Sequence, residues 1–170
     1  MALQLFKIAD LLVESPASSV TFSSIPQGYT DLILFVSFRS STEDIANNTW
    51  LTFNGVGGTA YTSRTIYTSN GTSAVSGAEV GTARSSQIFT SSSTSPAKTF
   101  GNMLIHVPNY SSSKIKSWSA DWACENNAAS CNLGLVAGQF NSTAAITSIN
   151  LQPYCCAWLA NSTATLYGVL

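Results

Sequence analysis

Charged side chains are scarce in this sequence of 170 residues. Seven Lys and Arg and eight Asp and Glu make up 9% of the chain, with a formal net charge of −1. An average soluble protein carries roughly 25% charged residues. The basic residues stand singly along the chain, so no basic stripe is available to meet a phosphate backbone. We therefore expect no nucleic-acid partner.

Long apolar runs are missing as well. The longest candidate, Leu32 to Phe38, is interrupted by Ser37 and falls far short of the ~20 residues of a membrane-spanning helix. The opening Met-Ala-Leu-Gln-Leu-Phe-Lys lacks the positive region, long apolar stretch and small-residue cleavage site of a signal peptide. We expect no membrane partner, and we expect synthesis in the cytoplasm.

The four cysteines, Cys124, Cys131, Cys155 and Cys156, all lie in the last third of the chain. Their spacing matches neither a zinc site nor a redox Cys-x-x-Cys pair, so no metal and no cofactor is expected. Cys124 and Cys131 flank a turn-like segment and could form a disulfide in a hairpin, although thiols are the favoured interpretation in reducing cytosol. In a strand, Cys155 and Cys156 would point to opposite faces, and a bridge between them would be strained.

Alternation of apolar and polar residues predicts β-strands along most of the chain. Between residues 30 and 39, one face carries Leu32, Leu34, Val36 and Phe38, which is typical of a central strand. Residues 49–53 and 60–68 are expected to form a hairpin through the turn at Asn54-Gly55. Residues 69–95 are rich in Ser, Thr, Gly and Ala, and are either a long loop or two short edge strands that contact a partner.

A second hairpin is expected in the last third of the chain. Between residues 114 and 124, Trp118 and Trp122 share one face with the alanine and cysteine that alternate with them. The strand from residue 131 to 140 is expected to meet this tryptophan face across the hairpin with the set Cys131, Leu133, Leu135 and Ala137.

These patterns predict an all-β fold. About nine strands, with no helical periodicity outside Leu3 to Val13, indicate an antiparallel β-sandwich of jelly-roll-like type. Residues 17–170 are expected to form one domain, and residues 1–16 either an N-terminal anchoring arm or an additional edge strand.

The sequence shows no catalytic constellation. His106 is the single histidine, and a general base needs a nucleophile and an orienting partner that the sequence does not reveal. The carboxylates are scattered, and the glycine-rich residues 54–58 do not open a helix that could hold phosphate. We therefore expect no enzyme and no catalytic residue.

Four segments carry a resemblance to a known class of proteins. The run Val-Thr-Phe-Ser-Ser-Ile-Pro-Gln-Gly-Tyr-Thr-Asp-Leu, residues 20–32, resembles the opening of short β-rich virion proteins of tailed bacteriophages, cyanophages among them. Residues 100–110, 144–149 and 162–169 agree with the same proteins. The similarity covers nearly the whole chain, but its motifs are strand and turn sequences and no catalytic signature is among them.

The resemblance implies a structural role. A head decoration, or cement, protein would sit on the outer capsid surface of the virion, with the major capsid protein and copies of itself, as a homotrimer, as partners. The alternative is a tail-fibre or receptor-binding module that recognises a host surface glycan, and a third reading is a free carbohydrate-binding module. Decoration is favoured because the chain shows no fibrous repeat or coiled coil through which a fibre would join a tail.

Apolar and aromatic side chains are the candidate contacts with the capsid or with other subunits, because such residues anchor protein interfaces. The candidates are Leu3, Leu5, Phe6, Trp50, Tyr61, Tyr67, Phe89, Tyr110, Tyr154 and Trp158.

Overall fold

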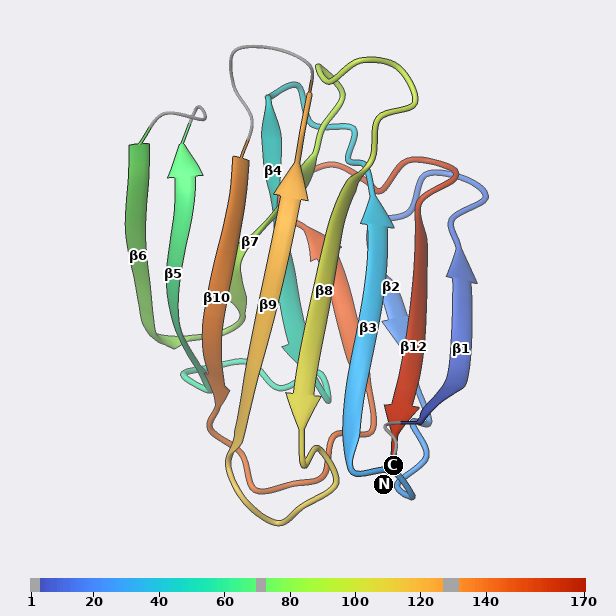
Figure 1. The fold of residues 1–170 in the computed structure, drawn as a ribbon, viewed down its shortest axis with the longest axis vertical. Helices are drawn as coiled ribbons and strands as arrows, with labels where there is room; N and C mark the ends of the chain where they lie inside the picture. The colour runs from blue at the N-terminus through green and yellow to red at the C-terminus, as the bar shows by residue number, and fades with distance from the viewer. Residues whose placement is uncertain (1–3, 70–72, 127–131) are drawn as a thin grey trace.

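The fold is an antiparallel β-sandwich, as the alternation predicted. The computed structural model describes residues 4–69, 73–126 and 132–170, and these form twelve strands in two sheets where the sequence indicated about nine (Figure 1). Within these ranges there is no helix, and therefore none long and apolar enough to cross a lipid bilayer.

The larger sheet has eight strands and the smaller has four, and they lie as two layers one behind the other (Figure 1). In spatial order the large sheet consists of β1 (Leu5–Leu12), β12 (Thr163–Val169), β3 (Asp31–Phe38), β8 (Gly101–Pro108), β9 (Lys116–Cys124), β10 (Asn132–Phe140), β5 (Tyr61–Ser69) and β6 (Ser73–Thr82). The small sheet consists of β2 (Val20–Phe22), β11 (Ile149–Pro153), β4 (Ala46–Phe53) and β7 (Ser85–Ser91).

The first described segment is an edge strand of the large sheet. Strand β1 pairs antiparallel with β12, and a β-bulge between Lys7 and Ala9 shifts the register. The N-terminal segment was expected to be either an anchoring arm or an additional edge strand, and residues 5–12 form the edge strand. Leu3 lies outside the described residues.

The core lies between the two sheets. Strand β3 contributes Leu32, Leu34, Val36 and Phe38, all buried, and runs between β12 and β8 inside the large sheet. This is the central strand that the alternation between residues 30 and 39 predicted.

Three aromatic residues expected at an interface are core residues instead. Tyr61, Tyr110 and Trp158 have no exposed surface. Each one satisfies its polar atom inside the protein: the Tyr61 hydroxyl donates to the Val56 carbonyl at 3.1 Å, the Tyr110 hydroxyl to the Pro26 carbonyl, and Trp158 Nε1 to the Leu151 carbonyl at 3.1 Å. The prediction of an interface role for these three was wrong, because a buried aromatic with a backbone partner needs no external contact.

The tryptophan face of β9 meets glycines, and the leucines expected there lie elsewhere. The predicted hairpin of β9 and β10 is present, but its register places Trp118 opposite Gly138 and Trp122 opposite Gly134. Leu133 and Leu135 therefore point away from the core, and the prediction for them was wrong. The indole rings occupy the space above the glycines, so the inner face of β10 has no room for a row of leucines.

The other predicted hairpin is not formed. Strands β4 and β5 belong to different sheets, so the loop through Asn54-Gly55 crosses from one layer to the other. Residues 69–95 were expected to be either a long loop or two edge strands, and the described part of this segment forms two edge strands. Strand β6 is an edge of the large sheet and β7 an edge of the small sheet.

Candidate functional site

One face of the large sheet packs on no other described element. The small sheet covers its inner face, while the outer face, which is toward the viewer in Figure 1, has no strand of the described chain across it. In most antiparallel sheets such a face carries polar side chains. Here large apolar side chains lie among the polar ones, and we call this outer surface of the eight strands the open face.

The middle of the open face is a single row of side chains that are direct partners across all eight strands. Each member pairs in register with the next, and so the row runs at right angles to the strands. In spatial order it consists of Asp10, Thr165, Phe35, Leu104, Asp121, Leu135, Ile66 and Ser76.

The apolar members of this row are exposed to an unusual degree. Leu135 has 65% of its surface exposed, Ile66 63% and Phe35 43%. Leu135 and Ile66 lie directly opposite one another on β10 and β5, where cross-strand side chains are ~5 Å apart. Leu133, 53% exposed, extends the apolar surface along β10. Single exposed leucines are common on proteins, but a contiguous exposed patch marks an interaction site.

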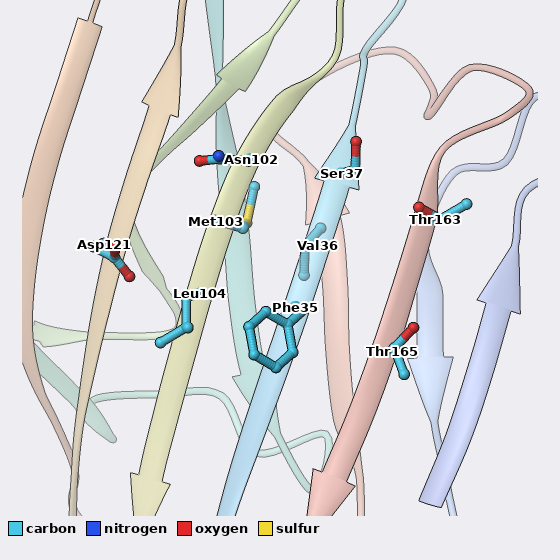
Figure 2. A pocket seen from close by; sticks show the side chains of 9 residues that line it. All are labelled: Phe35, Val36, Ser37, Asn102, Met103, Leu104, Asp121, Thr163 and Thr165. Atoms are coloured by element: carbon cyan, nitrogen blue, oxygen red, sulfur yellow. The ribbon is translucent and has the colours of Figure 1, made fainter. Parts of the chain in front are cut away.

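Open hollows follow the same row. Figure 2 shows one of them, of about 400 Å³, with the Phe35 and Leu104 side chains at its centre and Asp121 and Thr165 on either side. Two further hollows lie next to it along the row, one between Leu104 and Leu135 and the other between Leu135 and Ile66. The open face is thus grooved across the strands and can accept side chains from a partner.

Asp121 is the one charged residue between Phe35 and Ile66 in the row. Its neighbours in register are Leu104 on β8 and Leu135 on β10, and its side chain is exposed. A carboxylate flanked by apolar side chains loses water when a partner covers it, so the partner must supply a cation or a hydrogen-bond donor at that point. Asp121 therefore gives the open face a selective element within an apolar surface.

The open face has the dimensions of one protein interface. Eight strands at a spacing of ~4.8 Å span ~34 Å, and eight residues along a strand span ~27 Å. The product is on the order of 900 Å², and a standard interface buries about 800 Å² on each partner. Its size fits one protein partner better than a small ligand.

Two polar pairs also lie on the open face. Lys7 Nζ and Asp10 Oδ2 are 2.5 Å apart, and this exposed ion pair raises the pKa of Lys7 and lowers that of Asp10, mainly through the hydrogen bond between them. His106 Nε2 lies 3.0 Å from Asp31 Oδ2, and the Asn109 amide donates to the other carboxylate oxygen at 3.0 Å. The half-exposed His106, near the end of β8, is therefore held by the carboxylate at the start of β3.

A separate aromatic cluster lies on the opposite side of the sandwich. Trp50 on β4 and Tyr154 after β11 make an edge-to-face contact with ring centroids 5.3 Å apart. The Arg84 guanidinium lies 3.4 Å above the Trp50 ring. Trp50 is therefore partly covered on one face, while Tyr154 is 60% exposed.

The remaining candidate residues are divided between surface and core. Leu5 and Phe6 lie on β1 and are exposed, and Phe6 stacks on Tyr29 with centroids 5.8 Å apart. Tyr67 and Phe89 are half-buried and stack on one another at 5.7 Å, against the core. The candidates do not converge on one surface, so they do not define a site.

The residues that form the open face were not among the sequence candidates. Phe35, Leu104, Asp121, Leu135 and Ile66 come from five different strands. One signal could have found part of the set: β3 carries apolar residues on both of its faces, which a strand with a solvated outer face does not need.

The three cysteines that the structure describes, Cys124, Cys155 and Cys156, belong to no recognised metal site. Among the described residues, no group of three or more His, Cys, Asp or Glu side chains is placed to hold a metal ion. The possible Cys124–Cys131 disulfide lies outside the described residues, because Cys131 does. Cys124 is buried, and its thiol approaches the Asn132 carbonyl at 3.5 Å.

Comparison with protein-family models, with curated proteins and with solved structures gave no match.

Proposed function

We propose that this protein is a head decoration protein of a tailed bacteriophage. It binds the outer capsid lattice of the virion through the open face and stabilises the head by burying that face against the major capsid protein. The observation that supports the proposal is the registered row from Phe35 to Ile66, which leaves large apolar side chains exposed on the outer face of the large sheet. Apolar burial is worth roughly 25 cal/mol per Å², so covering the apolar side chains of this row favours the contact.

Self-association is the second part of the proposal, with three copies forming a trimer. Strand β6 is a ten-residue edge strand, and edge strands that must not pair usually carry exposed charges or proline. The one charged residue of β6 is Glu79, which accepts a hydrogen bond from the Ser63 hydroxyl at 2.8 Å and others from the Ser86 hydroxyl and amide. Because Glu79 is engaged within the chain, this edge has no charge protecting it from another subunit.

Binding to heads that lack the protein tests the proposal. The purified chain should bind such heads and raise the temperature at which they lose their DNA. Leu135→Arg should reduce binding at least about tenfold, because it places a charge in the middle of the apolar row. Leu170→Arg is the matched control, since Leu170 is 52% exposed at the end of the chain beyond β12, and it should bind as the wild type does.

Asp121 gives a second test at the same surface. Asp121→Lys should weaken head binding more than Asp121→Asn, because only the former repels a cation on the capsid. Failure of the wild-type chain to bind heads at any concentration would overturn the proposal. Immunogold labelling of intact particles gives the location directly, and gold confined to the tail would also count against it.

The aromatic cluster supports the alternative of a receptor-binding module for a host glycan. Tyr154 offers an exposed ring for stacking on a sugar, and it is held from the side by Trp50, whose ring Arg84 covers. Under this alternative, Tyr154→Ala should abolish binding to host cells while Leu135→Arg leaves it unchanged. Under the decoration role, Leu135→Arg should weaken binding to heads and Tyr154→Ala should leave it unchanged. These two variants therefore separate the two functions.

A further inference from the structure

Two neighbouring cysteines are brought into contact by the loop that follows β11. Cys155 Sγ and Cys156 Sγ lie 3.2 Å apart, although adjacent residues of an extended strand would point them in opposite directions. The chain achieves this because Cys156 has a φ of +70°, in the left-handed region that non-glycine residues rarely adopt. The expectation that the pair points to opposite faces was wrong, because these residues lie in a loop and not in a strand.

The loop is held in this conformation from both sides. The Cys155 carbonyl accepts hydrogen bonds from Asn47 Nδ2 at 3.3 Å and from Thr42 Oγ1 at 3.5 Å. On the other side, the Ala157 amide donates to Ser41 Oγ at 3.1 Å and its carbonyl accepts from the Ser41 amide at 2.9 Å. An unfavourable φ persists only where the surroundings over-determine it, and such positions gather at functional sites.

The two thiols differ in environment. Cys155 is half-buried and its sulfur lies 3.4 Å from Thr42 Oγ1, while Cys156 is exposed. The hydrogen bond from Thr42, followed by that from Cys156, lowers the pKa of Cys155, and the same contact with Cys155 raises the pKa of Cys156. Two nearby carboxylates oppose ionisation: Asp44 raises the pKa of Cys155, although less than the two hydrogen bonds lower it, and Glu43 raises the pKa of Cys156. The thiolate therefore forms first on Cys155.

We propose that Cys155 and Cys156 are a redox-modification site, at which a hydroperoxide converts the two thiols into a vicinal disulfide. The contact between the sulfurs and the positive φ of Cys156 carry this proposal, which is independent of any role on a phage head. Closure requires the sulfurs to move from 3.2 Å to ~2.0 Å, a small shift for an exposed side chain.

The reaction takes place in two balanced steps. The Cys155 thiolate attacks the terminal peroxide oxygen, so an S–O bond forms, the O–O bond breaks and an alcohol or water leaves after taking up a proton. The Cys156 sulfur then attacks the Cys155 sulfenic acid, so the S–S bond forms and hydroxide leaves, taking up the thiol proton as water. In total, two thiols and one hydroperoxide give one disulfide, one alcohol and one water.

The sequence around the pair allows a direct test by mass spectrometry. The full chain is exposed to a small excess of hydrogen peroxide, its remaining thiols are alkylated after unfolding, and it is cleaved with chymotrypsin. Cleavage after Tyr154 and Trp158 releases the tetrapeptide Cys155-Cys156-Ala157-Trp158. We expect this peptide to be lighter by two hydrogen atoms and free of alkyl groups, and to recover both thiols after treatment with dithiothreitol.

Variants assign the two roles. With Cys156→Ser, the Cys155 sulfenic acid has no resolving thiol and should be trapped by dimedone, whereas Cys155→Ser should prevent fast oxidation. Thr42→Val should slow the reaction about fivefold or more, because it removes the hydrogen bond to the Cys155 sulfur, and Thr42→Ser should restore the rate.

Two outcomes would overturn the proposal. One is a tetrapeptide from the wild-type chain with both thiols alkylated, and so still reduced, at a peroxide dose that oxidises Cys155 in the Cys156→Ser chain. The other is a disulfide that joins two chains, seen as a dimer on a non-reducing gel, in place of the bond within the loop. Dimedone labelling of the Cys156→Ser chain reports the reaction of Cys155 with peroxide alone. It therefore distinguishes a disulfide that fails to close from a Cys155 thiol that fails to react.

Discussion

Trp118 packs directly against Gly138. The two residues are direct partners on β9 and β10, and a Cβ atom built on Gly138 would lie 2.0 Å from Cε2 of the indole. Gly134 and Trp122 repeat the arrangement four residues away, with a closest approach of 2.5 Å. The absence of side chains at these two positions is therefore what allows the tryptophans to fill the inner face.

Gly138→Ala should destabilise the protein by about 3 kcal/mol, because the added methyl group overlaps an indole that has no free space to move into. The free energy of unfolding in urea measures the effect. Gly28→Ala is the matched control, because no atom lies within 4 Å of the Cβ built there, and it should change stability by less than about 0.5 kcal/mol. Equal stability of the two variants would show that Trp118 can be displaced at no cost.

Lys116 is a buried cation at the start of β9. Its Nζ donates to the carbonyls of Ser112, Lys114 and Ala144, each at 2.7 Å, and burial lowers the pKa of the ammonium group. Lys116→Met should cost about 2 kcal/mol or more, because the substitution leaves these carbonyls without their donor. The exposed Lys114 is the control, and Lys114→Met should have little effect in the same urea titration.

Tyr61 makes stability depend on alkaline pH. Burial raises the pKa of Tyr61 to about 12, whereas in the unfolded chain its pKa is close to 10. A folded pKa above the unfolded one means that the native state holds its proton longer. The stability contributed by the neutral phenol is therefore complete below pH 10 and is lost as the pH rises from 10 to about 12.

The Tyr61→Phe variant isolates this effect. At pH 7 it should be less stable than the wild type by about 1 kcal/mol, because the Tyr61 oxygen no longer accepts from the Phe53 amide at 2.8 Å. Between pH 10 and pH 11 the two stabilities should converge by about 1 kcal/mol, since only the wild type loses the phenol contribution. Comparing the two proteins cancels contributions from Tyr110 and Lys116. Parallel curves over this range would contradict the burial argument.

The β-sandwich could be predicted from the sequence because alternation reports two-fold periodicity directly. Alternation does not show which face of a strand is buried in the core. In β10 the alternating sets are Leu133, Leu135 and Ala137 on one side and Gly134, Val136 and Gly138 on the other, and hydrophobicity alone favours the first set. The structure buries the second, because the volume of the tryptophans on the neighbouring strand decides the packing. A single chain shows periodicity but not neighbours.

The candidate site was missed for the same reason. Leu135 and Ile66 were separately visible as apolar residues, but their adjacency on an outer face depends on the pairing of β10 with β5, which are far apart in the sequence. The contact between Cys155 and Cys156 was also out of reach, because it depends on one positive φ that the residue types do not indicate. Local patterns predict elements, while sites on this fold arise from long-range register.

Self-association through β6 gives a prediction about mass. Val80 is 70% exposed on this edge strand, and lysine on an edge is one of the features that keep natural sheets from pairing. Sedimentation velocity should find the wild type as a trimer and Val80→Lys as a monomer at the same concentration. Val56→Lys, in the loop between β4 and β5, makes the same change at another exposed valine and should remain a trimer. If Val80→Lys is still a trimer, the subunit contact does not involve β6. If the wild type stays monomeric at high concentration, the proposed self-association is wrong and only the proposed capsid contact through the open face remains.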